Sequence, residues 1–403
     1  MKKRVMITGL GTFLSGGKNI DEFRKTLFEG ISKIKNITLF DTKGYHSRIA
    51  AEIKDYNPYN YFSKKELNRL SRTDQFAIIA AKEAIKISRL SIDELRKKRV
   101  GISLGAGTGG MFLAEKYHKE YLKKKKPKPS LLIPFIPSYT TDQVAKELGI
   151  KGPIFTTTTA CSSSATAIGI GADIILEGIA DIMITGGSDS LCELTFGGFN
   201  SLRAMDPVTC RPFDKDRAGM VLGEGAAILV LESEQSALSR DAPILGEFLG
   251  YAMVGEAYHI TAPEETGELQ SYVMELALKD ANISKDEIDL INAHGTGTPH
   301  NDLVETVAIK KLFGKKAYNI PVTANKSMIG HCLGSAGAVE AAASLISILE
   351  GFIPPTINIK NLDPKCDLDY VTEGARIKNI NYVLSNSFAF GGNLTSLIIG
   401  KRA

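Results

Sequence analysis

The most informative part of the sequence is Thr156-Thr157-Thr158-Thr159-Ala160-Cys161-Ser162-Ser163-Ser164. The four threonines follow Ile154 and Phe155, and this β-branched, apolar run is typical of a strand. From Ser162 to Leu176 the residues are small and apolar, which is typical of a buried helix. The sequence therefore predicts that Cys161 lies in a turn between a strand and a helix.

This predicted position has a chemical consequence for Cys161. The first N–H groups of a helix are unpaired and carry partial positive charge, so they stabilise a thiolate. The same turn can supply an N–H to an oxyanion hole. Most free cysteines, however, are small buried residues with no reaction to perform. The local pattern leaves both interpretations open.

Length and composition indicate a globular protein. The 403 residues are 43% hydrophobic and 23% charged. The net charge of +4 is too small to indicate nucleic-acid binding by itself. The 5 cysteines have no paired spacing, which favours reduced thiols and a cytoplasmic location. We find neither a signal peptide nor an apolar stretch long enough to cross a membrane, and we expect no membrane partner.

Short strands alternate with helices along the whole chain, which predicts buried sheets covered by helices. The chain divides near residues 236–243 into two parts of similar rhythm, 1–240 and 241–403. We interpret Gly9-Leu10-Gly11 as a turn after a first strand at residues 5–8. Ser63-Lys64-Lys65-Glu66 has the form of a capping box, and the helix is predicted to continue to residue 87.

Two histidines occupy matching turns in the second part. His294 begins His294-Gly295-Thr296-Gly297-Thr298 after a predicted strand, and His331 ends Lys326-Ser327-Met328-Ile329-Gly330-His331. A single histidine in a loop is more often structural or exposed than catalytic. Two of them, with Cys161 in a third turn of this kind, predict one active site at the ends of the strands.

The residue types indicate acyl transfer. A cysteine thiolate forms a thioester with an acyl group, and two neutral imidazoles can donate to a carbonyl oxygen that gains negative charge. Lys326 helps to keep both imidazoles neutral. No spacing of carboxylates and histidines predicts a metal site. A cysteine protease fits less well, because it needs only one histidine.

Four motifs in this order together resemble the β-ketoacyl-acyl carrier protein synthases of type I/II, the ketosynthase II-like condensing enzymes. They are Thr159-Ala160-Cys161-Ser162-Ser163, His294-Gly295-Thr296-Gly297-Thr298, Lys326-Ser327-Met328-Ile329-Gly330-His331 and Ser387-Phe388-Ala389-Phe390-Gly391-Gly392. The resemblance implies a thiolase-like fold, with duplicated halves in five layers (αβαβα), and a homodimer.

The resemblance also implies the reaction and the roles of the residues. An acyl group from acyl carrier protein would pass to Cys161, and malonyl-acyl carrier protein would then lose CO₂ and attack the thioester. His294 and His331 would stabilise the enolate, with Lys326 organising them. The N–H groups of Cys161 and Phe390 would form the oxyanion hole. Phe388 and Phe390 would form a gate. No cofactor is implied, because the substrates arrive on the phosphopantetheine of the carrier.

Further residues receive expected roles from the same resemblance. Glu340, Glu305 and Asp302 would support the histidines and Lys326. Thr108 would line the acyl pocket, with Ile136 entering from the dimer mate. Basic residues of the predicted helix after Ser63 would dock the acidic carrier protein. They are Lys64, Lys65, Arg69 and Arg72, with Arg203 and residues 123–126 as weaker candidates.

Several residues depart from the pattern of this family. Ala389 replaces a glycine and would resist a positive φ if the gate needs one. Thr108 is smaller and more polar than the usual aliphatic residue, and Cys161-Ser162-Ser163-Ser164 is similar to polyketide ketosynthases. Fatty acid elongation therefore has two alternatives: a ketosynthase of a polyketide or polyene type pathway, or a chain-length-factor-like subunit in a heterodimer. The presence of Cys161 disfavours the last.

Overall fold

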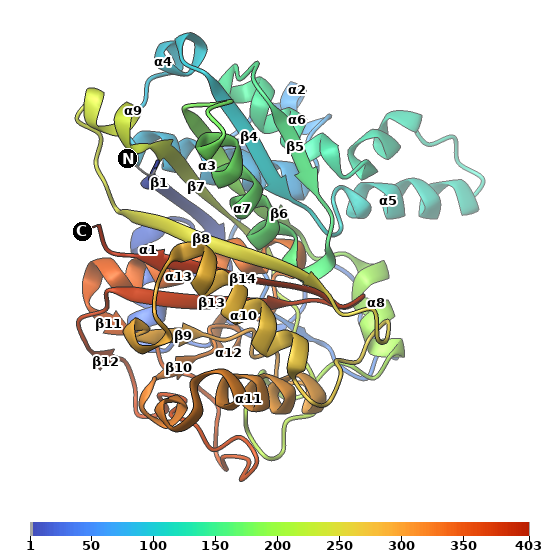
Figure 1. Cartoon of the computed structure of the whole chain (residues 1–403). Helices are drawn as coiled ribbons and strands as arrows, with labels where there is room; N and C mark the ends of the chain where they lie inside the picture. The colour runs from blue at the N-terminus through green and yellow to red at the C-terminus, as the bar shows by residue number, and fades with distance from the viewer. Residues whose placement is uncertain (1–2, 403) are drawn as a thin grey trace.

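One large sheet organises the protein, and the computed structural model describes residues 3–402. Ten strands form this sheet in the order β10-β9-β13-β14-β8-β1-β7-β6-β4-β5 (Figure 1). Their bounds are β1 Val5–Leu14, β4 Val100–Gly105, β5 Ile154–Thr157, β6 Ile182–Asp189, β7 Gly225–Ser233, β8 Gly246–Gly255, β9 Leu290–Asn292, β10 Val322–Thr323, β13 Tyr382–Phe388 and β14 Asn393–Gly400.

The sheet consists of two similar halves. In the N-terminal half, β5, β4 and β6 are parallel neighbours, and β7 and β1 follow in antiparallel pairing. In the C-terminal half, β10, β9 and β13 are parallel, and β14 and β8 follow in antiparallel pairing. β1 and β8 join the halves. The predicted duplicated α/β fold is confirmed, whereas the division of the chain at residue 240 stays a prediction.

Helices cover both outer faces and fill the space between the halves (Figure 1). α3 and α6 cover the N-terminal strands, α7 and α13 lie between the halves, and α10 and α11 cover the C-terminal side. The longer helices are α1 Ile20–Glu29, α3 Arg72–Ile87, α5 Met111–Leu122, α6 Ser138–Leu148, α7 Ser163–Leu176, α10 Glu268–Ala281, α11 Pro299–Phe313 and α13 Ala336–Glu350. The shorter ones are α2 Lys64–Leu67, α4 Ile92–Lys97, α8 Glu193–Ser201, α9 Glu234–Ser239 and α12 Lys326–Ile329.

β1 corrects the interpretation of Gly9-Leu10-Gly11 as a turn, because the strand continues through both glycines to Leu14. A Cβ on Gly9 would lie 2.3 Å from the carbonyl oxygen of Ala84, and a Cβ on Gly11 would lie 2.0 Å from that of Ala80. The glycines therefore allow the backbone of α3 to pack directly on β1. Their role is close packing between a helix and a strand.

The helix predicted from Ser63 to residue 87 is two helices. α2 ends at Leu67, and α3 begins at Arg72. Ser71 caps α3 with Asp74 in a second capping box, like that of Ser63 with Glu66. Because the second cap satisfies the N–H groups of a new helix start, the chain turns between residues 67 and 72.

Two further expectations need correction. β5 ends at Thr157, so Thr158 and Thr159 belong to the turn before Cys161. Residues Leu333–Glu350 are long and apolar enough to cross a membrane, contrary to the expectation from the sequence. However, 89% of this segment is buried inside the protein, where α13 packs against α7. Its apolar composition is that of a core helix.

Candidate active site

Cys161 lies where β5 leads into α7. It is in a short 3₁₀ turn, Ala160–Ser162, directly before α7. Ala160 has a φ of 51°, a left-handed conformation that non-glycine residues adopt only with strain. This turn places the buried thiol beside a cavity of about 350 Å³.

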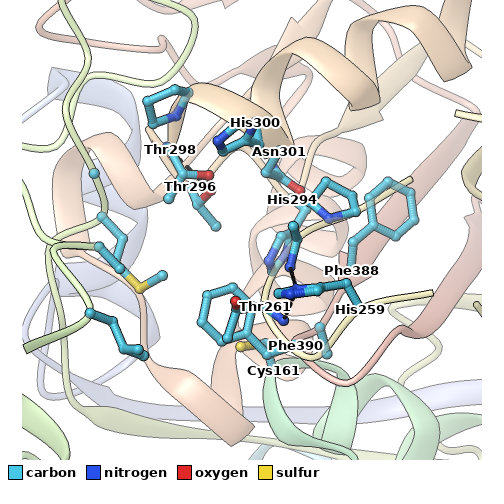
Figure 2. A pocket seen from close by; sticks show the side chains of 18 of the residues that line it. Cys161, His259, Thr261, His294, Thr296, Thr298, His300, Asn301, Phe388 and Phe390 are labelled. Carbon is cyan, nitrogen blue, oxygen red and sulfur yellow. Dashed lines mark hydrogen bonds between the residues drawn. The ribbon is translucent and has the colours of Figure 1, made fainter. Parts of the chain in front are cut away.

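The two histidines reach the same cavity from the C-terminal half (Figure 2). His294 lies between β9 and α11, and His331 lies between α12 and α13. One potential ligand atom from each of Cys161, His294 and His331 lies within 4.8 Å of the other two. The imidazole centroids are 5.3 Å apart, with the rings nearly perpendicular. The structure thus brings together three residues that are far apart in the sequence.

Hydrogen bonds indicate the tautomer of each histidine. The N–H of Leu333 donates to Nδ1 of His331 at 3.1 Å, and Nζ of Lys326 lies 3.4 Å from Nδ1 of His294. A neutral ring whose Nδ1 accepts a hydrogen bond carries its proton on Nε2. Nε2 of His331 is buried and has no hydrogen-bond partner within residues 3–402. Both rings therefore present N–H donors, which suit an oxygen that gains negative charge better than a metal ion, which needs lone pairs.

Burial and Lys326 keep both histidines neutral. Burial, followed by the charge of Lys326, lowers the pKa of His294 and of His331 well below the ordinary value of 6.5. Lys326 is itself buried, forms an ion pair with Glu340 and donates to the carbonyl oxygen of His294 at 2.6 Å. Burial raises the pKa of Glu340 to about 7, and Lys326 opposes this rise. The buried cation thus orients one ring and disfavours protonation of both.

Cys161 differs from the expectation of a stabilised thiolate. Burial raises the pKa of its thiol to about 11, although Lys326 and the backbone N–H of Phe390 both lower that pKa. The sequence indicated the start of the helix but could not indicate that the sulfur is buried. Desolvation of the anion outweighs the nearby positive groups here.

The acidic residues predicted to support the site hold the His294 turn. Glu305 accepts the N–H groups of His294 and Gly295 at 2.8 and 2.9 Å. Asp302 accepts the N–H groups of Gly297 and Phe213. Both carboxylates are buried and do not line the cavity among the described residues. They act on the backbone of the turn and reach the imidazole only indirectly.

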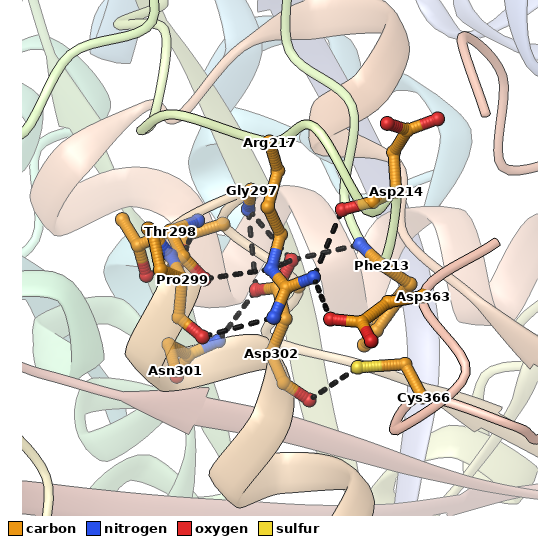
Figure 3. A network of polar contacts seen from close by, with 12 residues as sticks. Phe213, Asp214, Arg217, Gly297, Thr298, Pro299, Asn301, Asp302, Asp363 and Cys366 are labelled. Carbon is orange, nitrogen blue, oxygen red and sulfur yellow. Dashed lines mark hydrogen bonds and ion pairs between the residues drawn. The ribbon is translucent and has the colours of Figure 1, made fainter. Parts of the chain in front are cut away.

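Sequence analysis missed Arg217, which holds the same turn (Figure 3). Its guanidinium donates to the carbonyl oxygens of Thr298 and Pro299 at 3.2 and 2.9 Å, and to Asp363 at 2.7 Å. It also lies 3.7 Å from Asp302. Only 4% of its side chain is exposed. The sequence contains no signal for this role, because the contacts of Arg217 join segments far apart in the chain.

The wall of the cavity also contains groups that received no role from the sequence. Thr296 and Thr298 line it and share a hydrogen bond of 2.8 Å, and His259, Ile260 and Thr261 come from the loop after β8 (Figure 2). Phe388 and Phe390 line the same cavity, and the ring of Phe388 lies 6.2 Å from that of His294.

The predicted acyl-pocket residues lie outside this cavity. The hydroxyl of Thr108 donates to Asp189 at 2.8 Å, and Ile136 is 55% exposed. Neither is among the described residues that line the cavity. Ile136 follows a short 3₁₀ segment, Pro129–Phe135, beside α5, which extends away from the rest of the molecule in Figure 1.

Of the four predicted docking residues, Arg72 needs correction. Lys64, Lys65 and Arg69 are exposed, on α2 and just after it. Arg72 begins α3, and its guanidinium pairs with the buried Glu224 at 2.5 Å. Only 16% of its side chain is exposed. Arg72 therefore holds the fold together and is not available to a partner.

Comparisons with known proteins cover the whole chain. Residues 2–237 match the family Beta-ketoacyl synthase, N-terminal domain, and residues 245–360 match Beta-ketoacyl synthase, C-terminal domain. A 3-oxoacyl-[acyl-carrier-protein] synthase 2 from a Synechocystis species is 42% identical over 99% of this chain and 98% of its own. The Staphylococcus aureus (strain COL) protein of the same name is 41% identical over the same shares.

Solved structures show the same similarity in three dimensions. The ishigamide ketosynthase/chain length factor is 37% identical with a TM-score of 0.96, and the comparison covers 100% of both chains. A β-ketoacyl synthase from Burkholderia phymatum is 32% identical with a TM-score of 0.92, again over 100% of both chains. These structures have the thiolase-like fold predicted from the motifs. The chain belongs to the β-ketoacyl synthase family.

Proposed function

We propose that this protein catalyses the decarboxylating Claisen condensation of an acyl group, held on Cys161, with malonyl-acyl carrier protein. The product is a β-ketoacyl-acyl carrier protein that is two carbons longer. This proposal rests on one observation: a thiol lies close to two neutral imidazoles that present N–H groups. A nucleophile and two donors for an enolate are the groups that this reaction needs.

In the first half-reaction, the sulfur of Cys161 attacks the thioester carbonyl of the acyl carrier protein. The backbone N–H groups of Cys161 and Phe390 stabilise the oxyanion of the tetrahedral intermediate. The bond between the carbonyl carbon and the phosphopantetheine sulfur breaks, and the carrier leaves as its thiol with the proton that Cys161 loses. The acyl group remains as a thioester on Cys161.

In the second half-reaction, the malonyl thioester enters through the cavity. The bond to its carboxylate breaks, CO₂ leaves, and the electron pair becomes an enolate whose oxygen accepts from His294 and His331. The enolate carbon attacks the thioester on Cys161, forming the new carbon–carbon bond and releasing the sulfur as a thiolate, which takes up a proton from water to restore the thiol. Lys326 and Glu340 keep the two rings oriented and neutral in this step.

Fatty acid elongation is the pathway that we favour, since relatives named 3-oxoacyl-[acyl-carrier-protein] synthase 2 are 41–42% identical over nearly the full length. A specialised polyene or polyketide pathway is the second candidate. It is supported by the similarity in structure to the ishigamide ketosynthase/chain length factor. We place the reaction in the cytoplasm and require no cofactor besides the phosphopantetheine of the carrier.

Acyl carrier protein is the expected partner, as in a solved relative described as a type II ketosynthase in complex with its acyl-carrier protein, 31% identical to this chain. Lys64, Lys65 and Arg69 present exposed positive charge to an acidic carrier. The phosphopantetheine would pass Thr296 and Thr298, whose hydroxyls line the route to Cys161.

A second copy of the chain is the expected partner at the edge of the sheet. β5 is an edge strand, and its Ile154 and Phe155 are each 43% exposed. Further exposed apolar residues lie in and after the nearby 3₁₀ segment: Leu132, Ile133, Phe135 and Ile136. An exposed apolar edge strand pairs readily with the same strand of another copy. A homodimer would cover this surface and bring Ile136 towards the partner's acyl pocket.

Intact-mass spectrometry tests the proposal. We incubate the protein with a series of acyl-carrier proteins, then add malonyl-carrier protein. We expect an acyl adduct that depends on Cys161 and disappears on elongation, no adduct on Cys161→Ala, and an unchanged adduct on Cys192→Ala, another buried cysteine. Saturated straight chains should react in fatty acid elongation, whereas reaction only with unsaturated or aryl chains would favour the specialised pathway. No adduct with any carrier would contradict the proposal.

A further inference from the structure

Asp189 is a buried carboxylate that the proposed reaction does not use. It ends β6, and its exposed fraction is 0%. No lysine or arginine of residues 3–402 forms an ion pair with it. A buried carboxylate without a cation is costly unless hydrogen-bond donors surround it. The donors that surround Asp189 come from two turns, one after β4 and one after His331.

The first donors come from the turn after β4. The N–H groups of Gly107 and Thr108 donate to Asp189 at 3.0 and 2.7 Å, and the Thr108 hydroxyl donates at 2.8 Å. The hydroxyl is therefore turned towards the carboxylate. The position of Thr108, which the sequence predicts in the acyl pocket, depends on Asp189.

The remaining donor comes from the turn after His331. The N–H of Gly334 donates to Asp189 Oδ2 at 2.6 Å. The residue before it, Leu333, has a φ of 51° and donates its own N–H to Nδ1 of His331. This strained conformation persists only where the surroundings hold it. The carboxylate holds Gly334, and the same turn fixes the tautomer and direction of the His331 ring.

The glycines at this point leave no room for a different arrangement. A Cβ on Gly334 would lie 2.5 Å from the backbone nitrogen of Gly107 and 2.6 Å from Asp189 Oδ2. A Cβ on Gly107 would lie 2.7 Å from the same oxygen. The two turns therefore close directly on the carboxylate, one from each half of the protein.

We propose that Asp189 is a positioning residue, whose carboxylate fixes the turn of residues 333–334 and thereby holds the Nε2–H of His331 towards the enolate. The inference rests on the proposed function. Burial raises the pKa of Asp189 to about 6, so the group accepts as a carboxylate at neutral pH. An asparagine has the same shape but only one acceptor oxygen, and its NH₂ would face N–H groups. Asp189→Asn therefore loosens the turn without removing volume.

The test compares decarboxylation with the chemical reactivity of the Cys161 thiol. Decarboxylation of malonyl-carrier protein needs the His331 donor, whereas alkylation of Cys161 by iodoacetamide does not. We expect Asp189→Asn to lower the decarboxylation rate by roughly tenfold to a hundredfold, the effect of a small misplacement of a reacting group. Alkylation should not slow, because the charge of Asp189 is one of the influences that raise the pKa of the Cys161 thiol, and its loss favours the thiolate.

A matched control excludes general destabilisation. Glu83 is a carboxylate outside the site that accepts the N–H groups of Thr12 and Ile20 at 2.8 and 3.0 Å. Glu83→Gln should leave the ratio of the two rates unchanged. If Asp189→Asn does not fold, Gly334→Ala, which displaces the same turn, should produce the same selective loss of decarboxylation.

Three results would overturn the inference: decarboxylation within about twofold of the unmodified protein in both turn variants, an equal loss of decarboxylation and of Cys161 alkylation, or the same selective loss in Glu83→Gln. Failure of the proposed function is recognised separately, because the unmodified protein would then release no CO₂ from malonyl-carrier protein. In that case the proposed role of Asp189 in orienting His331 is rejected together with the proposed function.

Discussion

At the scale of single residues, the charge state of the site follows from burial. Cys161, His294, His331, Lys326 and Glu340 are all buried, and desolvation is the main cause of the shifted pKa values of Cys161, His294, His331 and Glu340. The two rings stay neutral because they are buried and because Lys326 lies beside them. Neutral rings are the useful form here, since each can donate one N–H without attracting a second anion.

The neutral histidines predict how stability depends on pH. Their folded pKa values lie well below 6.5, so below pH 6.5 the unfolded chain binds protons that the folded chain does not. Their contribution to the free energy of unfolding therefore falls as the pH falls through this range. His331→Asn should make the dependence on pH shallower by up to about 1.4 kcal/mol per pH unit.

Urea unfolding at a series of pH values between about 5 and 7 measures this slope. His46→Asn replaces an exposed histidine and is expected to keep the original slope. An unchanged slope in His331→Asn would show that this ring is protonated in the folded protein, contrary to the argument from burial and Lys326.

At the scale of elements, the loop between β13 and β14 forms part of the wall of the cavity beside Cys161. Gly391 donates to the carbonyl oxygen of Ile260, and Gly392 accepts from Glu256, both at 2.8 Å. Gly391 and Gly392 have φ values of 82° and 75°, whereas the φ of Ala389 is not positive. Alanine at 389 is therefore compatible with this conformation, and the strain expected from the sequence does not arise in it.

We expect different effects from alanine at two glycines, one in this loop and one in the neighbouring strand. Gly391→Ala must place a Cβ at a positive φ and should lower the free energy of unfolding by about 1–2 kcal/mol, with a slower acylation of Cys161. Gly255→Ala, at the end of the neighbouring β8, has no positive φ and no described atom within 4 Å of its Cβ, so it should be close to neutral. Equal stability and acylation rates in the two variants would contradict this account.

At the scale of the whole molecule, the duplicated sheet leaves one apolar edge uncovered at β5. Each half contributes different groups to the site: the N-terminal half supplies Cys161 and the C-terminal half supplies both histidines. Because α7 and α13 pack between the halves, the two sets of groups are held at a fixed separation. A second copy bound at the β5 edge would extend the sheet.

The exposed apolar edge at β5 predicts that the protein is a dimer. Phe155→Lys places a charge on β5 and should convert a dimer to a monomer, because a lysine on an edge strand disfavours pairing. Light scattering after size-exclusion chromatography measures the mass. Ile377→Lys changes a residue that is 74% exposed and lies away from that edge, so it should remain dimeric. A monomeric unmodified protein, or a dimeric Phe155→Lys, would rule out this interface.

The amino-acid sequence alone determined the reaction class and most of the elements. Cys161, His294 and His331 could be found because each lies in a turn between periodic segments, and such turns are local features of sequence. Strand and helix patterns predicted the duplicated α/β fold, which the structure confirms. The errors at Gly9, Gly11 and the break between α2 and α3 arose where a distant helix or a second cap overrode the local pattern.

Only the tertiary structure decided what surrounds these groups. Three features depend on segments far apart in the chain. They are the ion pair of Arg72 with Glu224, the hydrogen bonds of Arg217 to the His294 turn, and the contacts of Asp189 with both Thr108 and the turn after His331. The raised pKa of Cys161 likewise comes from enclosure by several elements at once. Burial and hydrogen bonding are sums over spatial neighbours, and the sequence lists only neighbours along the chain.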